Sequence, residues 1–468
     1  MEVLATAAEG TAPILADECA ALGLRVVHVR RDGVVLDLNT TSTARALVQL
    51  RVATRLLLAL DDVRSGDADD LYNSLRNMDW THWLDDRHTI AVRASGPLPG
   101  SPEAPKRRGR PSRGKGIRTH VFAAQRAKDA ICDHLRGRHG ARPNVDVDDP
   151  DVQIVLRFRG DRCGIYLDIS GDAMHRRGYR IDAVDAPLKE TLAAALVAVV
   201  DWDGTRPLID PMCGSGTLII ESLMRFLQIA PGMKRDFAIE RWPHHGAAVS
   251  ALLEKEREAA QAVATASIAA AKDLQVVAGD FDRAALRATR THLERVGLTD
   301  IVHVVRHNVR RMDSPPANAV VVCNPPYGER IGGKNVTDLY EAMAARWSTF
   351  ADADVWVLDG HEAFVSHFGY RPRHSWPLRN GKLHVRWHHY RLIEEALLPV
   401  APVAAPTPAF SEDTPPDSVD TFAVDDDRDS AESNAVFSSE EAAPSPVFES
   451  SNSPDQLAEP APLLDAPA

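Results

Sequence analysis

The chain has 468 residues, with 54 basic and 66 acidic side chains, a net charge of −12 and 44% hydrophobic residues. This length predicts two or three folded domains. The longest uninterrupted apolar stretch, Leu192 to Val200, is far shorter than the ~20 residues of a membrane-spanning helix, so we expect no membrane partner.

The five cysteines lie at positions 19, 132, 163, 213 and 323, and no two of them are within four residues of each other. This spacing argues against a CxxC zinc site and against a disulfide framework. It favours a reducing cytoplasm as the location of the protein, and we expect no bound metal.

Residues 1–60 read as a small α+β unit. Apolar spacing predicts helices over Ile14–Leu22 and Thr43–Leu60, with strands Arg25–Arg30 and Val34–Leu38 between them. Residues 61–172 continue as a second α+β unit, with a helix over His120–Arg136 and the strands Thr89–Arg93, Gln153–Phe158 and Gly164–Ile169.

A basic insertion interrupts the second unit at residues 97–118, where proline and glycine are frequent. It contains five residues that we expect to contact phosphates: Arg107, Arg108, Arg110, Arg113 and Lys115. Arg126 and Lys128 of the following helix extend this predicted nucleic-acid surface. A solvated linker is the alternative interpretation of the insertion.

From about Pro187 strands alternate with long helices, which predicts a parallel sheet covered by helices. In this part, an apolar strand is followed by a turn with Gly214 and Gly216 and then by a helix over Leu218–Leu227. Such a turn lets backbone pass close to a ligand and presents free N–H groups at the helix start. A P-loop is excluded because its Gly-Lys-Ser/Thr sequence is absent.

The next two strands, Leu274–Ala278 and Ile301–Arg306, end in polar residues. An acid at the end of the second strand can bind both hydroxyls of an adenosyl ribose, so we assign that role to Asp280. Phe281 can cover an adenine face, and Asn308 offers an amide to the adenine edge. Asp282 is a further candidate for cofactor binding, although we prefer for it the role of N-cap to the helix Arg283–Val296.

The fourth strand, Ala319–Cys323, leads into Asn324-Pro325-Pro326-Tyr327. Two prolines stiffen this corner and remove two donors. The Asn324 side chain and the Pro325 carbonyl can then accept both hydrogens of one exocyclic amine, which directs its lone pair toward an electrophile. Tyr327 can stack on the base. Cys213 and Cys323 read as small buried residues, not as nucleophiles, because no base adjoins them.

Beyond residue 397 the composition changes. Residues 398–468 hold 15 acidic groups, one arginine and 12 of the 31 prolines, without apolar periodicity. We predict that this acidic tail is disordered. The preceding residues carry 53 basic and 51 acidic side chains, so nucleic-acid binding is compatible with their charge.

These motifs resemble class I S-adenosylmethionine-dependent methyltransferases that act on exocyclic amines. The segments 142–153, 167–180 and 186–195 narrow the resemblance to the bacterial 23S ribosomal RNA guanine-N2 methyltransferases with a THUMP domain. The resemblance covers residues 10–397 and implies an α/β fold with four parts. These are a ferredoxin-like segment (1–60), an RNA-binding THUMP domain (61–172), a Rossmann-like methyltransferase domain (173–397) and the tail (398–468).

The resemblance also implies roles for residues. S-adenosylmethionine is expected to lie against the turn that follows the first strand, formed by Asp210, Pro211, Cys213, Gly214, Ser215, Gly216 and Thr217. Lys189 and Thr191 help to close that pocket. Asn324 to Tyr327 hold the guanine amine, with Asn324 also beside the cofactor, and Arg330 is expected to contact RNA.

We therefore expect methylation of a guanine N2 amine in structured RNA, either 23S ribosomal RNA or a ribosome-assembly intermediate. Some relatives carry a second methyltransferase domain where this chain has its tail, so we expect one methylation activity. Guanine-N2 methylation of transfer RNA, adenine-N6 methylation of nucleic acid and a non-catalytic, RNA-binding ribosome-assembly factor are the alternatives.

Overall fold

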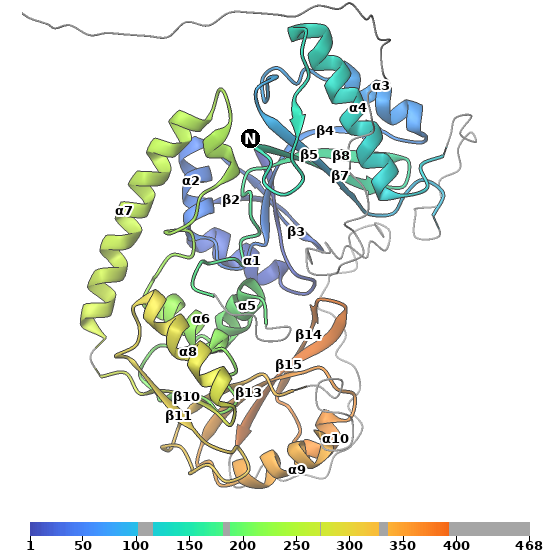
Figure 1. Cartoon of the computed structure of the whole chain (residues 1–468). Coiled ribbons are helices and arrows are strands. Elements are labelled where there is room, and N and C mark those ends of the chain that lie inside the picture. Colours follow the sequence, from blue (N-terminus) through green and yellow to red (C-terminus); the bar gives the residue numbers. More distant parts are fainter. Residues whose placement is uncertain (102–115, 181–187, 272, 327–335, 393–468) are drawn as a thin grey trace, which may run out of the picture. The chain divides into compact units, whose positions relative to one another are not determined.

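A computed structural model describes residues 1–101, 116–180, 188–271, 273–326 and 336–392 (Figure 1). Several sequence predictions lie outside these ranges: the acidic tail, Arg107, Arg108, Arg110, Arg113, Lys115, Tyr327 and Arg330.

Within the described ranges, the N-terminal half forms one eight-stranded sheet with the order β2-β3-β1-β4-β8-β7-β5-β6. Its strands are β1 (Glu2–Thr6), β2 (Arg25–Arg30), β3 (Gly33–Asp37), β4 (Arg55–Arg64), β5 (Thr89–Ser95), β6 (Asn144–Val145), β7 (Val152–Arg159) and β8 (Arg162–Asp168). Its helices are α1 (Ala12–Ala21), α2 (Thr40–Gln49), α3 (Ala68–Asn77) and α4 (His120–His139). The α+β prediction for this half is confirmed.

The helix predicted over Thr43–Leu60 is wrong in its second half, because α2 ends at Gln49 and the chain continues into β4. A half-buried carboxylate explains the break. Glu18 on α1 accepts the backbone N–H groups of Arg51 at 2.8 Å and of Val52 at 3.1 Å. Those two amides therefore bond to a side chain instead of continuing the helix, and the apolar residues that follow enter the sheet.

Strand β4 connects the two predicted N-terminal units. Leu58 pairs with Val3 of β1 on one side and with Leu167 of β8 on the other. The sheet thus continues through residue 60, and the ferredoxin-like and THUMP segments share it. Our division at residues 60 and 172 remains a proposal about domains.

The second half contains a seven-stranded sheet with the order β11-β10-β9-β12-β13-β15-β14 among the described residues. Its strands are β9 (Leu208–Asp210), β10 (Val276–Asp280), β11 (Val302–Arg306), β12 (Val320–Cys323), β13 (Ala353–Asp359), β14 (His374–Asn380) and β15 (Leu383–Leu392). Strands β9 to β13 are parallel, and β15 runs antiparallel to both neighbours. This is the predicted Rossmann-like arrangement.

Helices cover both faces of this sheet. They are α5 (Glu190–Val200), α6 (Thr217–Phe226), α8 (Arg283–Val296), α9 (Val336–Trp347) and α10 (Phe364–Phe368). The long helix α7 (Gly246–Ala270) instead packs mainly against α2 of the N-terminal half (Figure 1). Neighbouring residues of β9 point into different cores, since Leu208 packs with residues of α5, α6 and α8 whereas Ile209 packs with residues of α9 and α10. A strand buried on both faces explains its continuous apolar sequence. Among the described residues, no helix has both the length and the apolar character that crossing a bilayer requires.

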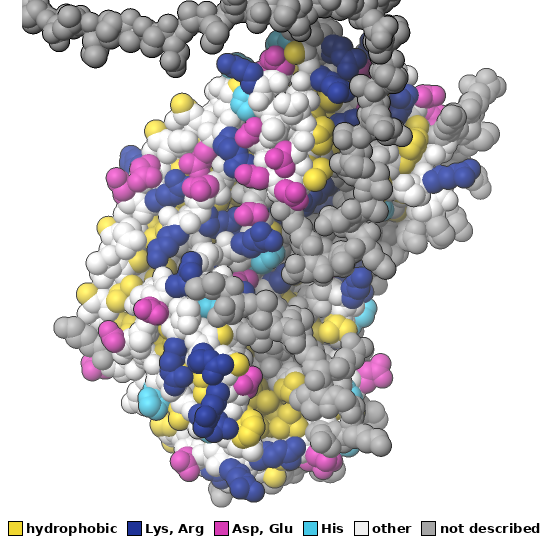
Figure 2. Space-filling view, viewed as in Figure 1, with side chains coloured by type: hydrophobic (Ala, Val, Ile, Leu, Met, Phe, Trp, Pro, Cys, Tyr) yellow, Lys and Arg dark blue, Asp and Glu magenta, His cyan; other side chains and the backbone are white. Residues whose placement is uncertain are grey.

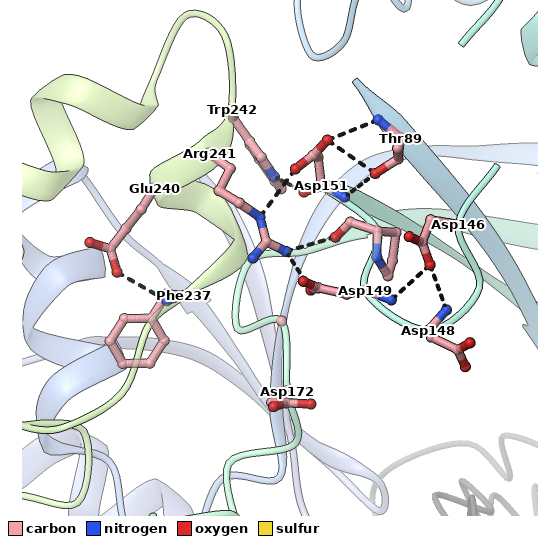
Figure 3. A network of polar contacts seen from close by, with 12 residues as sticks. Thr89, Asp146, Asp148, Asp149, Asp151, Asp172, Phe237, Glu240, Arg241 and Trp242 are labelled. Atoms are coloured by element: carbon pink, nitrogen blue, oxygen red, sulfur yellow. Dashed lines mark hydrogen bonds and ion pairs between the residues drawn. The ribbon is translucent and has the colours of Figure 1, made fainter. Parts of the chain in front are cut away.

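The connection between α6 and α7 is anchored to the predicted THUMP region by a polar network (Figure 3). It contains the short 3-10 helix Ala238–Arg241. Arg241 donates to Asp149 Oδ1 at 3.1 Å and to the Pro150 carbonyl at 2.8 Å, and Trp242 Nε1 donates to the Asp151 carbonyl at 3.2 Å. Asp151 in turn accepts from the backbone of Thr89 at the start of β5.

We predict that Arg241→Gln lowers the free energy of unfolding by about 1 kcal/mol, because it removes two ion pairs, with Asp149 and Asp151, and a hydrogen bond, all partly exposed to solvent. Urea unfolding followed by tryptophan fluorescence measures this difference. Arg138→Gln, which changes an exposed arginine of α4, serves as the charge-matched control. Equal stability of the two variants would contradict a stabilising role for the network.

Candidate active site at the carboxyl edge of the second sheet

The order of the strands brings the sequence motifs together. Strand β9 is hydrogen-bonded in parallel to β10 on one side and to β12 on the other. Their carboxyl ends therefore lie at one edge of the sheet, and the strand order reverses between β9 and β12. In open α/β sheets a ligand crevice forms outside the carboxyl ends at such a point.

The two glycines of the turn after β9 have left-handed backbones, with φ of +53° at Gly214 and +82° at Gly216. A Cβ atom at Gly216 would lie 2.9 Å from the Thr289 side chain, so this glycine is needed for packing of α6 against α8. A Cβ atom at Gly214 would meet no atom within 4 Å. Gly214 therefore presents backbone to open space, as a ligand-binding turn requires.

Asp280 at the end of β10 holds this turn in place. Its Oδ2 accepts the Gly214 N–H at 2.9 Å, and its Oδ1 accepts the Asp282 N–H at 2.9 Å. The sequence indicated a ribose ligand at this position but not the bond to the turn. A carboxylate has about four acceptor positions, so the two bonds leave capacity for a ligand hydroxyl.

The residues beyond β10 and β11 lie near the surface. The Phe281 side chain is 63% exposed, and the Arg306 guanidinium lies 5.0 Å from its ring centroid. Asp282 Oδ1 accepts the Ala284 N–H at 2.8 Å, which confirms its predicted role as the N-cap of α8. Asn308 is exposed, and its side-chain oxygen accepts the Arg310 N–H at 3.0 Å.

Asp210, the last residue of β9, is buried and 1% exposed. Its Oδ1 accepts the Met212 N–H at 3.0 Å. Burial raises the pKa of the Asp210 carboxyl well above its ordinary value, and the negative charge of Asp280 adds to that rise. The buried Asp210 carboxyl therefore stabilises the turn through its hydrogen bond with the Met212 amide.

The start of α5 adjoins the same turn. Arg180 pairs with Glu190 at 2.7 Å and donates to Thr217 Oγ1 at 3.0 Å. This places the segment of Lys189 and Thr191 beside the start of α6; Lys189 is half-buried and Thr191 is buried. Sequence reasoning did not select Arg180, although it connects the two segments.

Two backbone carbonyls of the turn also contact histidines of neighbouring elements. The Pro211 carbonyl lies 2.9 Å from His307 Nε2, and the Ser215 carbonyl lies 3.0 Å from His292 Nδ1. The Ser215 hydroxyl lies 3.4 Å from the Thr217 hydroxyl, and both side chains are buried. The turn is thus fixed from several elements at once.

Cys213 and Cys323 are buried and free, as predicted. Burial raises the pKa of both thiols well above the ordinary value, with the nearby carboxylates Asp210 and Asp280 adding to the effect. Both thiols therefore stay protonated near neutral pH, which supports the interpretation of small packing residues.

The Asn324-Pro325-Pro326 corner follows directly from β12. Asn324 is half-buried and Pro325 is buried. The hydroxyl of the fully buried Tyr340 on α9 donates to the Pro326 carbonyl at 3.0 Å. Sequence reasoning missed Tyr340, because the contact depends on how α9 packs under the corner.

Two residues predicted to bind RNA lie on α4, and both contact carboxylates. Arg126 pairs with Asp69 at 3.0 Å and lies 4.0 Å from the Tyr72 ring centroid. Lys128 pairs with Asp129 at 2.8 Å. Their charges are therefore partly neutralised.

Comparison with known families matches three regions. Residues 177–389 match the family described as "RMKL-like, methyltransferase domain", residues 105–168 match the THUMP domain, and residues 2–57 match the "RlmL ferredoxin-like domain". The three matches follow the order of the predicted parts.

Curated relatives cover most of the folded chain. A protein of Syntrophotalea carbinolica named ribosomal RNA large subunit methyltransferase K/L is 33% identical over 408 residues, which are 84% of this chain and 54% of that protein. The chain thus spans about half the length of this relative. A protein of Synechocystis sp. named as a candidate RNA methyltransferase, slr0064, is 30% identical over 81% of this chain and 94% of its own length.

Solved structures share the fold. SMU.472, described as a candidate methyltransferase complexed with SAH, superposes with a TM-score of 0.70 at 27% identity, covering 83% of this chain and 97% of that one. A protein of Listeria monocytogenes, named as a predicted N6-adenine-specific DNA methylase, gives a TM-score of 0.70 at 26% identity, covering 83% and 95%.

The buried Asp210 carboxyl leads to a prediction about pH. A carboxyl with a raised folded-state pKa binds more protons in the folded than in the unfolded chain, so its contribution to stability is lost as pH rises from ~4 through the folded pKa. We expect the free energy of unfolding of Asp210→Asn to fall less with rising pH than that of the unmodified protein. Denaturant unfolding at several pH values measures the two slopes, and identical slopes would reject the shifted pKa.

Tyr340→Phe removes the hydroxyl that holds Pro326 but keeps the ring in the core. Loss of one positioning hydrogen bond of ~0.5–1.5 kcal/mol corresponds to a fall in turnover of up to about tenfold. We expect this fall in kcat, with unchanged affinity for S-adenosylmethionine in calorimetry. Tyr370→Phe, another buried tyrosine of the same core, is the control. An unchanged kcat would show that the corner does not depend on Tyr340.

Proposed function

Since the chain belongs to the family of THUMP-containing, RMKL-like methyltransferases, we propose that it transfers a methyl group from S-adenosylmethionine to the exocyclic N2 amine of a guanine in structured RNA. The proposed substrate is 23S ribosomal RNA, because the Syntrophotalea carbinolica relative is named for the large ribosomal subunit. The observation that carries the proposal is the adjacency of β9 and β12, which sets the Asn324 corner beside the glycine turn.

The residues at the carboxyl edge fit S-adenosylmethionine. Gly214 faces open space where a ligand can approach the backbone, and Asp280 retains acceptor capacity for the ribose hydroxyls. The exposed ring of Phe281 and the amide of Asn308 adjoin the expected adenine position. The Asp210–Thr217 turn and the Lys189–Thr191 segment would hold the methionine part. When bound, the cofactor supplies an electrophilic methyl group on a sulfonium.

The Asn324-Pro325-Pro326 corner orients the amine that accepts the methyl group. The guanine N2 amine is conjugated to its ring and is a poor nucleophile unless its lone pair is directed. The Asn324 side-chain oxygen and the Pro325 carbonyl accept its two hydrogens, and the prolines offer no N–H that competes. The proton leaves after the methyl group is transferred, so no base with a tuned pKa is needed. The buried Tyr340 keeps the corner rigid, which preserves the reacting distance.

RNA is the proposed partner because a THUMP domain precedes the catalytic domain. The target base must leave its helix or be single-stranded to reach the corner. Contacts from the insertion at residues 107–115, from Arg126 and Lys128, and from Arg330 belong to this proposal, as does stacking of Tyr327 on the base. Adenine N6 has the same donor pattern as guanine N2, and the name of the Listeria neighbour refers to adenine. Transfer RNA is the other possible guanine-containing target.

The experiment that tests the proposal is Asn324→Ala. We expect methyl transfer to fall by about 100-fold or more, because the amine loses its orientation, whereas affinity for RNA is nearly unchanged. Mass analysis of nucleosides from ribosomal and transfer RNA, treated with enzyme and labelled S-adenosylmethionine, identifies the product. Asn73→Ala, at an exposed position on α3, is the matched control.

Turnover by Asn324→Ala equal to that of the control would reject the amine-holding role. N6-methyladenosine as the product would assign the site to adenine. Label in transfer RNA alone would replace the ribosomal substrate. No label in any RNA from the unmodified protein, despite RNA binding, would favour a non-catalytic assembly factor.

A further inference from the structure

A second basic surface lies on the catalytic half, apart from the predicted THUMP contacts. We call it the arginine face and define it by Arg283, Arg287, Arg290, Arg306 and Arg310, all of which are exposed. Arg283, Arg287 and Arg290 occupy one side of α8, since they are spaced at i, i+4 and i+7. Figure 2 shows dark-blue side chains gathered over the position that α8 has in Figure 1.

Positive charge is concentrated in this part of the chain. Residues 283–311 contain seven arginines and only two acidic residues, whereas the rest of residues 1–397 holds 46 basic and 49 acidic side chains. Residues 283–311 and the basic insertion at residues 97–118 are thus two positive stretches in an otherwise near-neutral sequence, and each can form a local binding surface for an anion.

Within the described ranges, carboxylates do not neutralise the positive charges of the arginine face. Among the described residues none of its five arginines forms an ion pair, whereas Arg126, Lys128 and Arg162 each bind an aspartate. The partners that hold the face together are neutral carbonyls. The positive charges of the five arginines are therefore available to a ligand.

Three of these carbonyl contacts join the face into one surface. Arg290 donates from α8 to Val304 of β11 at 3.1 Å, and Arg306 donates from β11 to the Phe281 carbonyl before α8 at 3.0 Å. Arg310 donates to the Asp338 carbonyl of α9 at 3.2 Å. These bonds restrain the arginine side chains, so a ligand that binds them loses less conformational entropy.

The arginine face begins at the active edge of the sheet and continues along α8. Arg306 is the last residue of β11 and is level with Asp280 of β10. Strands β11 and β12 are three positions apart in the sheet, which corresponds to ~14 Å at the usual strand spacing. A nucleic-acid strand that delivers one base to the Asn324 corner can thus reach the arginine face with its neighbouring nucleotides.

We propose that the arginine face binds the phosphates of the RNA strand that flanks the target base, as a second contact site beside that of the N-terminal half. This proposal rests on the proposed function. Guanidinium groups bind phosphate oxygens in bidentate geometry, and side chains on successive turns of α8, ~5–6 Å apart, can contact successive phosphates. Binding of RNA at these two sites would keep the strand extended along the carboxyl edge of the sheet.

The test is the triple variant R283Q/R287Q/R290Q in the full-length protein, with a stem-loop RNA that carries a single-stranded guanine. Binding is measured over a range of salt concentrations. Each lost phosphate contact lowers the slope of log Kobs against log salt by ~0.7 for single strands, so we expect the slope to fall by about 2. The triple variant R283K/R287K/R290K keeps the charges and is expected to restore the slope.

The charge-matched control is R371Q/R373Q/R386Q, which removes three exposed arginines near β14 and β15 at the opposite edge of the same sheet. We expect this variant to keep the slope of the unmodified protein. An equal fall of the salt slope in R283Q/R287Q/R290Q and in R371Q/R373Q/R386Q would overturn the proposal. It would show that the slope follows the net charge of the protein and not the arginine face. An unchanged slope in R283Q/R287Q/R290Q would overturn it as well.

Two further measurements separate this proposal from the proposed function. Calorimetry with S-adenosylmethionine should give the same dissociation constant for R283Q/R287Q/R290Q as for the unmodified protein. If the unmodified protein methylates RNA while the variant keeps its salt slope, only the arginine face is rejected. If the unmodified protein binds neither cofactor nor RNA, the proposed function itself fails.

Discussion

The parallel pairing of β9 with both β10 and β12 is the constraint on which the rest of the catalytic half depends. Hydrogen bonds between backbones fix the distance between these strands without help from side chains. The glycine turn, the Asp280 carboxylate and the Asn324 corner each extend from one of the three strands, so their relative positions are fixed when the sheet forms. Chemistry that needs a donor and an acceptor at a fixed separation is thereby placed on rigid elements.

Side-chain hydrogen bonds fix the conformation of the loops that the sheet brings together. Asp280 bonds to the Gly214 amide, so the turn has its shape before any ligand arrives. Tyr340 does the same for the Pro326 carbonyl from the opposite face of the sheet. In both cases a polar group contacts the backbone of a loop that carries little regular structure of its own. Such preorganisation reduces the ordering that binding would otherwise require.

Local signals were sufficient for some elements and not for others. The helix Arg283–Val296 was predicted with the bounds that α8 has, because a capping aspartate and a regular apolar spacing both lie within its own sequence. Residues 50–60 were misassigned because the decisive contact comes from Glu18, more than thirty positions away. The motifs at Asp280 and Asn324 predicted the location of the candidate site, but the contacts of Tyr340 and Arg180 depend on packing between elements. The lack of carboxylate partners for Arg283, Arg287 and Arg290 in the described part of the chain likewise depends on three-dimensional neighbours, which a charge count does not contain.

Strand β4 pairs with β1 through its first half and with β8 along most of its length. Its apolar residues belong to a core that also includes residues of both neighbouring segments. A shortened chain that begins after residue 60 would leave Tyr166 and Leu167 of β8 at an open strand edge. Such edges recruit strands from other molecules. Division of the protein at residue 60 is therefore expected to yield fragments that self-associate through β8.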